Sequence, residues 1–232
     1  MRRDNVFTRL IDYRRMAVDI IELMHKFYSY KDISTMLGIP PSMISRYLHR
    51  HSLPGKNIAE KIINNFIANS KISKEIANLI RKNPDLLYND VVANTLLLLT
   101  IRKFANEVIN ADVIISFNDP SISLAMKLSD AFMKNLVVLY FAPIVPGTRA
   151  ECFSIATNPI AIFACTRYDA LRTRASHALL VFPLVINVEA IGTICERIRS
   201  VLKIKEVIPL IIVCGSELKK YGGMSIKCIL ER

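Results

Sequence analysis

The segment from Lys31 to Arg50, with the sequence KDISTMLGIPPSMISRYLHR, constrains the fold of this 232-residue chain most strongly. Apolar residues at helical spacing predict a first helix, and these are Ile33, Met36 and Leu37. Gly38 can adopt the positive φ that ends a helix, and Ile39 can point back into a small core. Pro41 suits the first turn of a second helix with the inward stripe Ile44, Tyr47 and Leu48, although Pro40 lacks the side-chain oxygen of a usual N-cap. The segment therefore predicts two short helices joined by a tight turn.

The second helix has a polar and basic outer face, made of Ser42, Met43, Ser45, Arg46, His49 and Arg50. Such a face is typical of the helix-turn-helix, whose second helix enters the major groove of DNA. Arg46 could bond a guanine edge in bidentate fashion, while Arg50 and Lys31 could hold phosphates. We therefore predict that Lys31 and this face bind double-stranded DNA. An ordinary helical hairpin with a solvated basic face is the alternative.

The net charge of +11 favours polyanionic partners through phosphate contacts and counterion release. The chain is long enough for two domains, and 52% apolar residues argue against disorder. We predict a helix-turn-helix DNA-binding domain at residues 1–83, a linker at residues 84–90 and a second domain at residues 91–232. The first residues lack the apolar core of a secretory signal, and no apolar run is long enough to cross a bilayer. These features predict a cytoplasmic protein without a membrane partner.

All five cysteines lie in the second half of the chain, without a C-x-x-C motif or a histidine at metal-ligand spacing. We therefore expect no zinc site, no other metal and no cofactor. Free cysteines in strands and helices behave as small buried hydrophobic residues. The simplest interpretation is that these thiols are reduced.

The periodicity along the chain predicts an all-helical region followed by an α/β region. In the first region we expect three further helices, at Tyr13–Phe27, Asn57–Ile67 and Ser73–Lys82. In the second region we expect helices at Val91–Asn110, Ser121–Met133 and Val188–Leu202. The expected strands are Asp112–Phe117, Leu136–Phe141, Glu151–Ala156, Ile160–Thr166, Ala178–Phe182, Val207–Val213 and one near Ser225–Leu230. This order favours a mainly parallel sheet, with the third and fourth strands forming a small hood.

Three stretches of the second region, DVIISFNDPSISLAMKLSDAF, HALLVFPLVINVEAIGTICERIRS and VIPLIIVCG, have the element order of the type I phosphoribosyltransferase fold, which residues 91–216 resemble. With the helical region in front, the whole chain resembles archaeal transcription regulators that join a helix-turn-helix to a phosphoribosyltransferase-like domain. The resemblance implies a homodimer, whose second domain could sense a nucleotide or a phosphoribosyl metabolite.

The sequence departs from active phosphoribosyltransferases at the loop that holds the 5-phosphate of phosphoribosyl pyrophosphate. Active members carry two adjacent acidic residues at the end of the preceding strand, where this chain has Pro183 and Leu184. Without these acids, little remains to orient a ribose diol or a magnesium ion. We therefore expect no enzyme activity.

The resemblance also implies candidate ligand-binding residues in two loops and the arginine-rich middle segment. These are Asn118, Asp119, Ser121, Ser123, Arg172, Arg174, Asn187, Glu189, Gly192 and Thr193. Each set has an alternative: Asp119 and Ser121 could simply cap a helix, and the arginines could be solvated surface.

The leading hypothesis is a dimeric, sequence-specific transcription regulator. An active phosphoribosyltransferase with an attached DNA-binding domain, or a dimerisation module that binds no ligand, are the alternatives.

Overall fold

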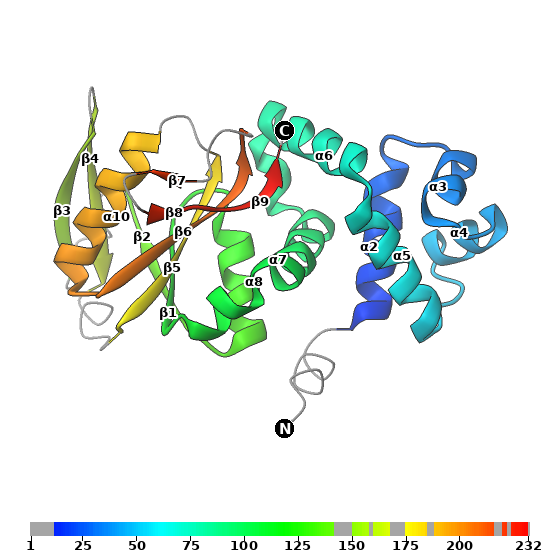
Figure 1. Ribbon diagram of the computed structural model, residues 1–232, viewed down its shortest axis with the longest axis horizontal. Coiled ribbons are helices and arrows are strands. Elements are labelled where there is room, and N and C mark those ends of the chain that lie inside the picture. The colour runs from blue at the N-terminus through cyan, green and yellow to red at the C-terminus, as the bar shows by residue number, and fades with distance from the viewer. Residues whose placement is uncertain are drawn as a thin grey trace.

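The computed structural model describes residues 12–141, 150–157, 160–167, 175–184, 188–215, 220–221 and 224–231. Helices occupy one end of the molecule, and a sheet with its covering helices and a hairpin occupies the other (Figure 1). No helix in these described ranges is long and apolar enough to cross a membrane.

Five helices form the described part of the helical end, and the sequence predicts all of them. They are α2 (Tyr13–His25), α3 (Tyr30–Leu37), α4 (Pro41–Leu48), α5 (Lys56–Ala68) and α6 (Ser70–Lys82). Each places an apolar stripe in one core, including the fully buried Ile20, Ile33, Ile44, Ile63 and Ile80. Helix α2 packs against both α4 and α5 and so supports the α3–α4 pair (Figure 1).

The segment that we predict as a linker is ordered and packed. It forms a short 3-10 helix, η1 (Pro84–Tyr88), in which Leu87 is only 1% exposed. One buried apolar cluster continues from α2 through Leu87 and α7 (Asp90–Asn110) to Ile229 at the far edge of the sheet. Residues 84–90 therefore do not separate two cores, although the domain boundary itself stays a prediction.

Among the described residues, the main sheet has five parallel strands in the order β2-β1-β5-β6-β9. They are β1 (Val113–Phe117), β2 (Asn135–Leu139), β5 (His177–Leu184), β6 (Glu206–Cys214) and β9 (Lys227–Glu231). The prediction of a mainly parallel sheet is thus confirmed. Alternate residues face opposite sides, as the two-residue period of a strand requires. Ile114 faces α7 and α8 (Ile122–Phe132), whereas Ile115 faces α10 (Val188–Leu202).

The predicted hood is an antiparallel hairpin of β3 (Ala150–Thr157) and β4 (Ile160–Arg167). It packs against α10, where Arg197 Nε donates to the Ser154 carbonyl at 3.0 Å. A second, very short hairpin of β7 (Lys220–Tyr221) and β8 (Met224–Ser225) is not predicted by the sequence, because two-residue strands leave no periodic pattern.

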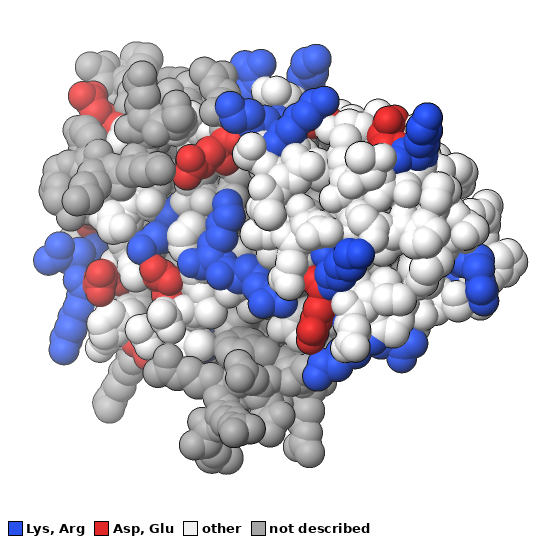
Figure 2. All heavy atoms as spheres, turned by 45° about the vertical axis from the view of Figure 1, so that its right-hand side comes forward, with Lys and Arg blue, Asp and Glu red and all other residues white. Residues whose placement is uncertain are grey.

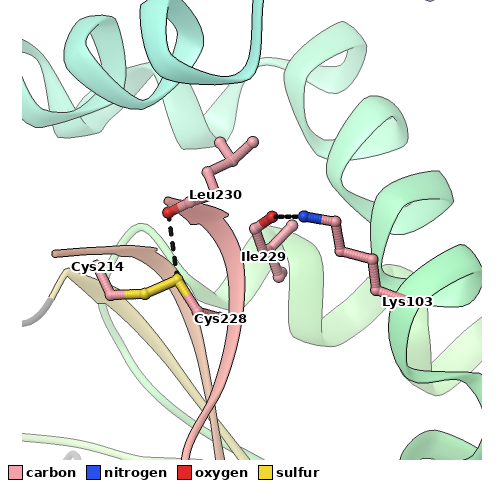
Figure 3. Close-up of a disulfide and its surroundings, with 5 residues drawn as sticks. All are labelled: Lys103, Cys214, Cys228, Ile229 and Leu230. Carbon is pink, nitrogen blue, oxygen red and sulfur yellow. Dashed lines mark hydrogen bonds between the residues drawn. A yellow bond between two sulfur atoms is a disulfide. The ribbon is translucent and has the colours of Figure 1, made fainter. Parts of the chain in front are cut away.

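The prediction of reduced cysteines is wrong for four of the five. Cys152 pairs with Cys165 between β3 and β4, and Cys214 pairs with Cys228 between β6 and β9, while the buried Cys195 is free. The second disulfide holds the edge strand β9, whose Ile229 carbonyl also accepts a bond from Lys103 Nζ at 2.7 Å (Figure 3). The error arises because strand pairing brings the sulfurs together. Cys152 and Cys165 are direct partners in the β3–β4 register, and Cys214 and Cys228 lie on the neighbouring strands β6 and β9. Neither arrangement can be read from cysteine spacing.

Candidate nucleic-acid interface and ligand crevice

Helix α3 begins at a capping box formed by Ser29 and Asp32. The Asp32 amide donates to Ser29 Oγ and the Ser29 amide donates to Asp32 Oδ2, each at 3.2 Å. These reciprocal bonds satisfy two backbone donors at the helix end. The hydrogen bond from the Ser29 side chain, together with that from its backbone, lowers the pKa of Asp32.

The turn after α3 is held by side chains of α5. Gly38 has a φ of 65°, the left-handed conformation that the sequence predicts. Asn65 Nδ2 donates to the Leu37 carbonyl at 2.8 Å, and Lys61 Nζ donates to the Gly38 carbonyl at 2.6 Å. A positive charge at the C-terminal end of a helix also interacts favourably with the helix dipole. Helix α5 therefore fixes where α4 begins.

Helix α4 begins at Pro41 without any side-chain cap, as Pro40 leads us to expect. Ile44 and Tyr47 are buried, which fixes the rotation of the helix about its axis. Past the helix end, Arg50 takes a left-handed φ of 55°, and its guanidinium lies 3.9 Å from the carboxylate of Glu22 on α2.

The predicted DNA-binding residues share one helix pair. Lys31 lies on α3 and the others lie on α4 or directly after it. Five of them are exposed, namely Lys31, Ser42, Arg46, His49 and Arg50, whereas Met43 and Ser45 are half-buried. The sequence has no acidic residue between Asp32 and Glu60, although Glu22 of α2 lies beside Arg50. Figure 2 shows separate Lys and Arg side chains among uncharged ones over the helical end, some with a carboxylate beside them.

Two residues of this surface, Lys61 and Asn65, are missing from the sequence prediction. They lie four positions apart on the polar side of α5, and only the tertiary structure shows that they cap α3. Polar residues at i and i+4 opposite a predicted tight turn are a weak signal for such a role.

A second candidate site lies at the carboxyl edge of the sheet. From β1 the chain passes over one face to β2, and from β5 it passes over the opposite face to β6. Neighbouring strands with connections in opposite directions form a topological switch point, where open α/β sheets bind ligands. Asn118–Ser121 follow β1 at this point, whereas residues 185–187, which follow β5 in the chain, lie outside the described residues.

The loop after β1 turns its polar groups toward each other. Ser121 is completely buried and bonds to Asp119 Oδ1 through both Oγ, at 2.5 Å, and its amide, at 2.8 Å. The hydroxyl of Ser116 lies 3.0 Å from that of Ser121. Desolvation by burial raises the pKa of Asp119, against the lowering effect of these bonds. The contacts favour a local turn at Asp119 and Ser121 over phosphate binding. Asn118 is exposed, and Ser123 is half-buried.

Strand β5 ends at Pro183 and Leu184, both apolar and half-buried. The first carboxylate after them belongs to Glu189, in the first turn of α10, where Thr193 Oγ1 donates to the Glu189 carbonyl at 3.0 Å. Glu189, Thr193 and the buried Gly192 line an open groove of about 670 Å³ along α10 and β6. No residue of the β1–α8 loop is among the described residues that line it.

The remaining candidates, Arg172, Arg174 and Asn187, lie outside the described residues. Within the described ranges, no group of three or more His, Cys, Asp or Glu side chains could hold a metal ion.

No protein-family model and no curated protein sequence matches this chain. Solved structures do match. The adenine phosphoribosyltransferase of Thermoanaerobacter pseudethanolicus has 12% sequence identity and a TM-score of 0.50, over 63% of this chain and 84% of that one. The enzyme of Giardia lamblia, complexed with 9-deazaadenine, has 9% identity and a TM-score of 0.48, over 64% of this chain and 84% of that one. The first of these matches, at 12% identity, shows the fold alone: the α/β part has a phosphoribosyltransferase fold.

Proposed function

We propose that this protein is a sequence-specific DNA-binding transcription regulator that acts as a homodimer. Helix α4 is the recognition helix, and the phosphoribosyltransferase-like part is a dimerisation and ligand-sensing domain without catalytic activity. The observation that carries the proposal is the exposed face of α4. The buried Ile44 and Tyr47 fix the rotation of this helix, and side chains of α5 hold the turn before it. Ser42, Arg46 and His49 remain exposed.

The geometry of the helix pair supports this role. A recognition helix inserts its outer face into the major groove, while the helix before it crosses the backbone. Arg46 then reaches base edges, and Lys31 on α3 contacts phosphate. One such helix reads only a few base pairs, so a second copy, one helical turn away, supplies the affinity that a specific site needs.

Selection of bound duplexes from a randomised library tests the proposal. We expect an enriched palindrome with half-sites about 10 bp apart, or a multiple of that spacing. Retention of duplexes without any enriched sequence, at moderate salt, would contradict it.

The fold match to adenine phosphoribosyltransferases favours one other function, an active transferase that also binds DNA. The assay is incubation with phosphoribosyl pyrophosphate, magnesium and a panel of bases, with pyrophosphate release as the readout. We expect no release, because β5 ends in Pro183 and Leu184 rather than in carboxylates. Release at a rate above that of a heat-denatured sample would establish the enzyme.

Ligand sensing is tested separately, by thermal denaturation with nucleotides and phosphoribosyl compounds. A ligand at 100 times its Kd stabilises the folded state by about 2.7 kcal/mol. Absence of a shift with every phosphate compound would favour a domain that only dimerises.

The proposed cytoplasmic location also bears on the source of the protein. Disulfides are rare in cytosolic proteins, except in hyperthermophilic archaea and bacteria. Two disulfides in an intracellular DNA-binding protein therefore favour an organism of that kind, in keeping with the resemblance to archaeal regulators.

A further inference from the structure

The exposed face of α6 carries a concentration of positive charge outside the helix pair. Four cations of this helix are exposed, namely Lys71, Lys74, Arg81 and Lys82. With 3.6 residues per turn, they occupy an arc of about 100° on one side of the helix. None of the four has an ion-pair partner within the described part of the chain. Figure 2 shows several Lys and Arg side chains near the top of the face that it draws.

The only carboxylate of α6 does not offset this charge at the surface. Glu75 is half-buried and accepts a hydrogen bond from the hydroxyl of Tyr28, in the turn before α3. The bond also fastens α6 to the α3 side of the helical end.

Helix stability does not account for the position of two of these cations. Arg81 and Lys82 lie in the last turn of α6, where a positive charge interacts favourably with the helix dipole. Lys71, however, lies in the first turn of α6, where the dipole opposes a positive charge, and Lys74 lies in the second turn, where the dipole does not favour one. An external anion would offset that unfavourable position.

The N-terminal end of α6 adjoins the predicted DNA surface. A shallow groove of about 460 Å³ is lined by Met36 of α3 and by Lys71. Lys31 and Lys71 both act on the carboxylate of Asp32, where their positive charges reinforce the effect of the Ser29 bonds. Lys31, the one cation of α3, and Lys71 of α6 therefore lie near the same surface carboxylate.

We propose that Lys71 and Lys74 bind the phosphate backbone of the same DNA duplex, beside the base pairs that α4 reads. The inference rests on the proposed function and adds the start of α6 to the protein surface that contacts DNA. Backbone contacts of this kind add affinity without sequence information. Each neutralised phosphate contributes about −0.9 to the slope of log K against log salt concentration.

The test measures that slope by fluorescence anisotropy, with a selected duplex and a scrambled one. For Lys71→Gln/Lys74→Gln we expect a slope shallower by about 2, since about two phosphate contacts are lost. The affinity for both duplexes should fall by the same factor. The matched control is Lys203→Gln/Lys205→Gln, which removes two exposed cations from the turn between α10 and β6 and should leave the slope unchanged.

The outcomes separate this inference from the proposed function. If wild type prefers the selected duplex but the α6 variant keeps its slope, only the α6 inference is overturned. Binding without sequence preference, combined with a shallower slope for the variant, overturns the proposed function and supports the α6 contact. If wild type binds no duplex, both fail. Trimming the duplex to the base pairs of the selected site gives a second test with unaltered protein, because it should make the wild-type slope shallower and leave that of the variant unchanged.

Discussion

The two ends of this molecule present their polar residues in opposite ways. On the helical end, Arg46 and His49 project from a helix whose inner side is fixed in the core. At the switch point of the sheet, Asp119 and Ser121 bond to each other, and Ser121 is fully buried. The first arrangement leaves side chains available to a large external partner, whereas the second leaves them already satisfied.

The difference teaches that a fold shared with enzymes does not locate the function. The α/β part keeps the parallel sheet and the switch point of a phosphoribosyltransferase, but β5 ends in apolar residues. The exposed cations of the helical end lie outside the part that shares its fold with these enzymes. A single buried cluster nevertheless runs through both ends.

Replacement of Leu87 tests that continuity and has the largest expected effect. The side chain is 1% exposed and lies in η1, between the two ends. Leu87→Ala should lower the free energy of unfolding by about 2–5 kcal/mol, through lost burial and the cavity left behind. Hydrogen exchange should show amides of both α5 and β5 losing protection together. Tyr88→Ala is the matched control, since Tyr88 is 54% exposed and should matter little. Loss of protection at one end only would show two independent units.

The disulfide of β9 tests the same coupling from the sheet side. Cys214→Ala/Cys228→Ala opens a link between residues 14 apart, which should cost about 3 kcal/mol. Because β9 packs against α6 and α7, amide exchange should accelerate in α6 as well. Cys152→Ala/Cys165→Ala opens a link of nearly equal length, between residues 13 apart in the hood hairpin, and should leave α6 unchanged. Equal acceleration of α6 by both pairs would contradict a specific role for β9.

The predicted DNA surface is tested by two substitutions that differ in what they contact. Arg46→Ala should weaken binding to the selected duplex by about 1–3 kcal/mol and relax the preference at one base position. Lys31→Ala should weaken binding to every sequence alike and make the salt slope shallower by about 1. Titrations of selected and scrambled duplexes over a range of salt concentrations measure both effects. An Arg46 variant that retains full sequence preference would exclude α4 as the reader.

The sequence predicts local structure well here and long-range contacts poorly. The bounds of α4 and α10 follow from periodicity, Pro41 and Gly38, because these signals act within a few residues. The disulfides depend on strand register, and the capping of α3 by Lys61 depends on how α5 crosses it. The periodicity of the sequence reveals neither the strand register nor the way in which α5 crosses α3.

The same contrast between local structure and long-range contacts separates the two candidate sites. The outer face of α4 is predictable because one helix supplies most of it. The crevice residues come from separate loops, and the inward turn of Ser121 toward Asp119 follows from burial that only the packed sheet creates.

Loss of the capping box of α3 should have the smallest effect on stability. It can be compared with loss of the N-cap of α7 at the other end of the molecule. Ser29→Ala should cost about 1 kcal/mol at neutral pH, as loss of an N-cap usually does. Because the pKa of Asp32 is lowered in the folded state, its contribution is present above the unfolded value of 3.8 and is lost as the pH falls through the folded value. The difference between Ser29→Ala and wild type should therefore shrink below about pH 4. Asn89→Ala is the matched control at the other end, because Asn89 caps α7 through the Val91 and Val92 amides without a carboxylate. Its cost should stay constant with pH. Urea denaturation of the three proteins between pH 3 and pH 7 measures this, and an equal pH dependence for both variants would show that Asp32 takes no part in capping α3.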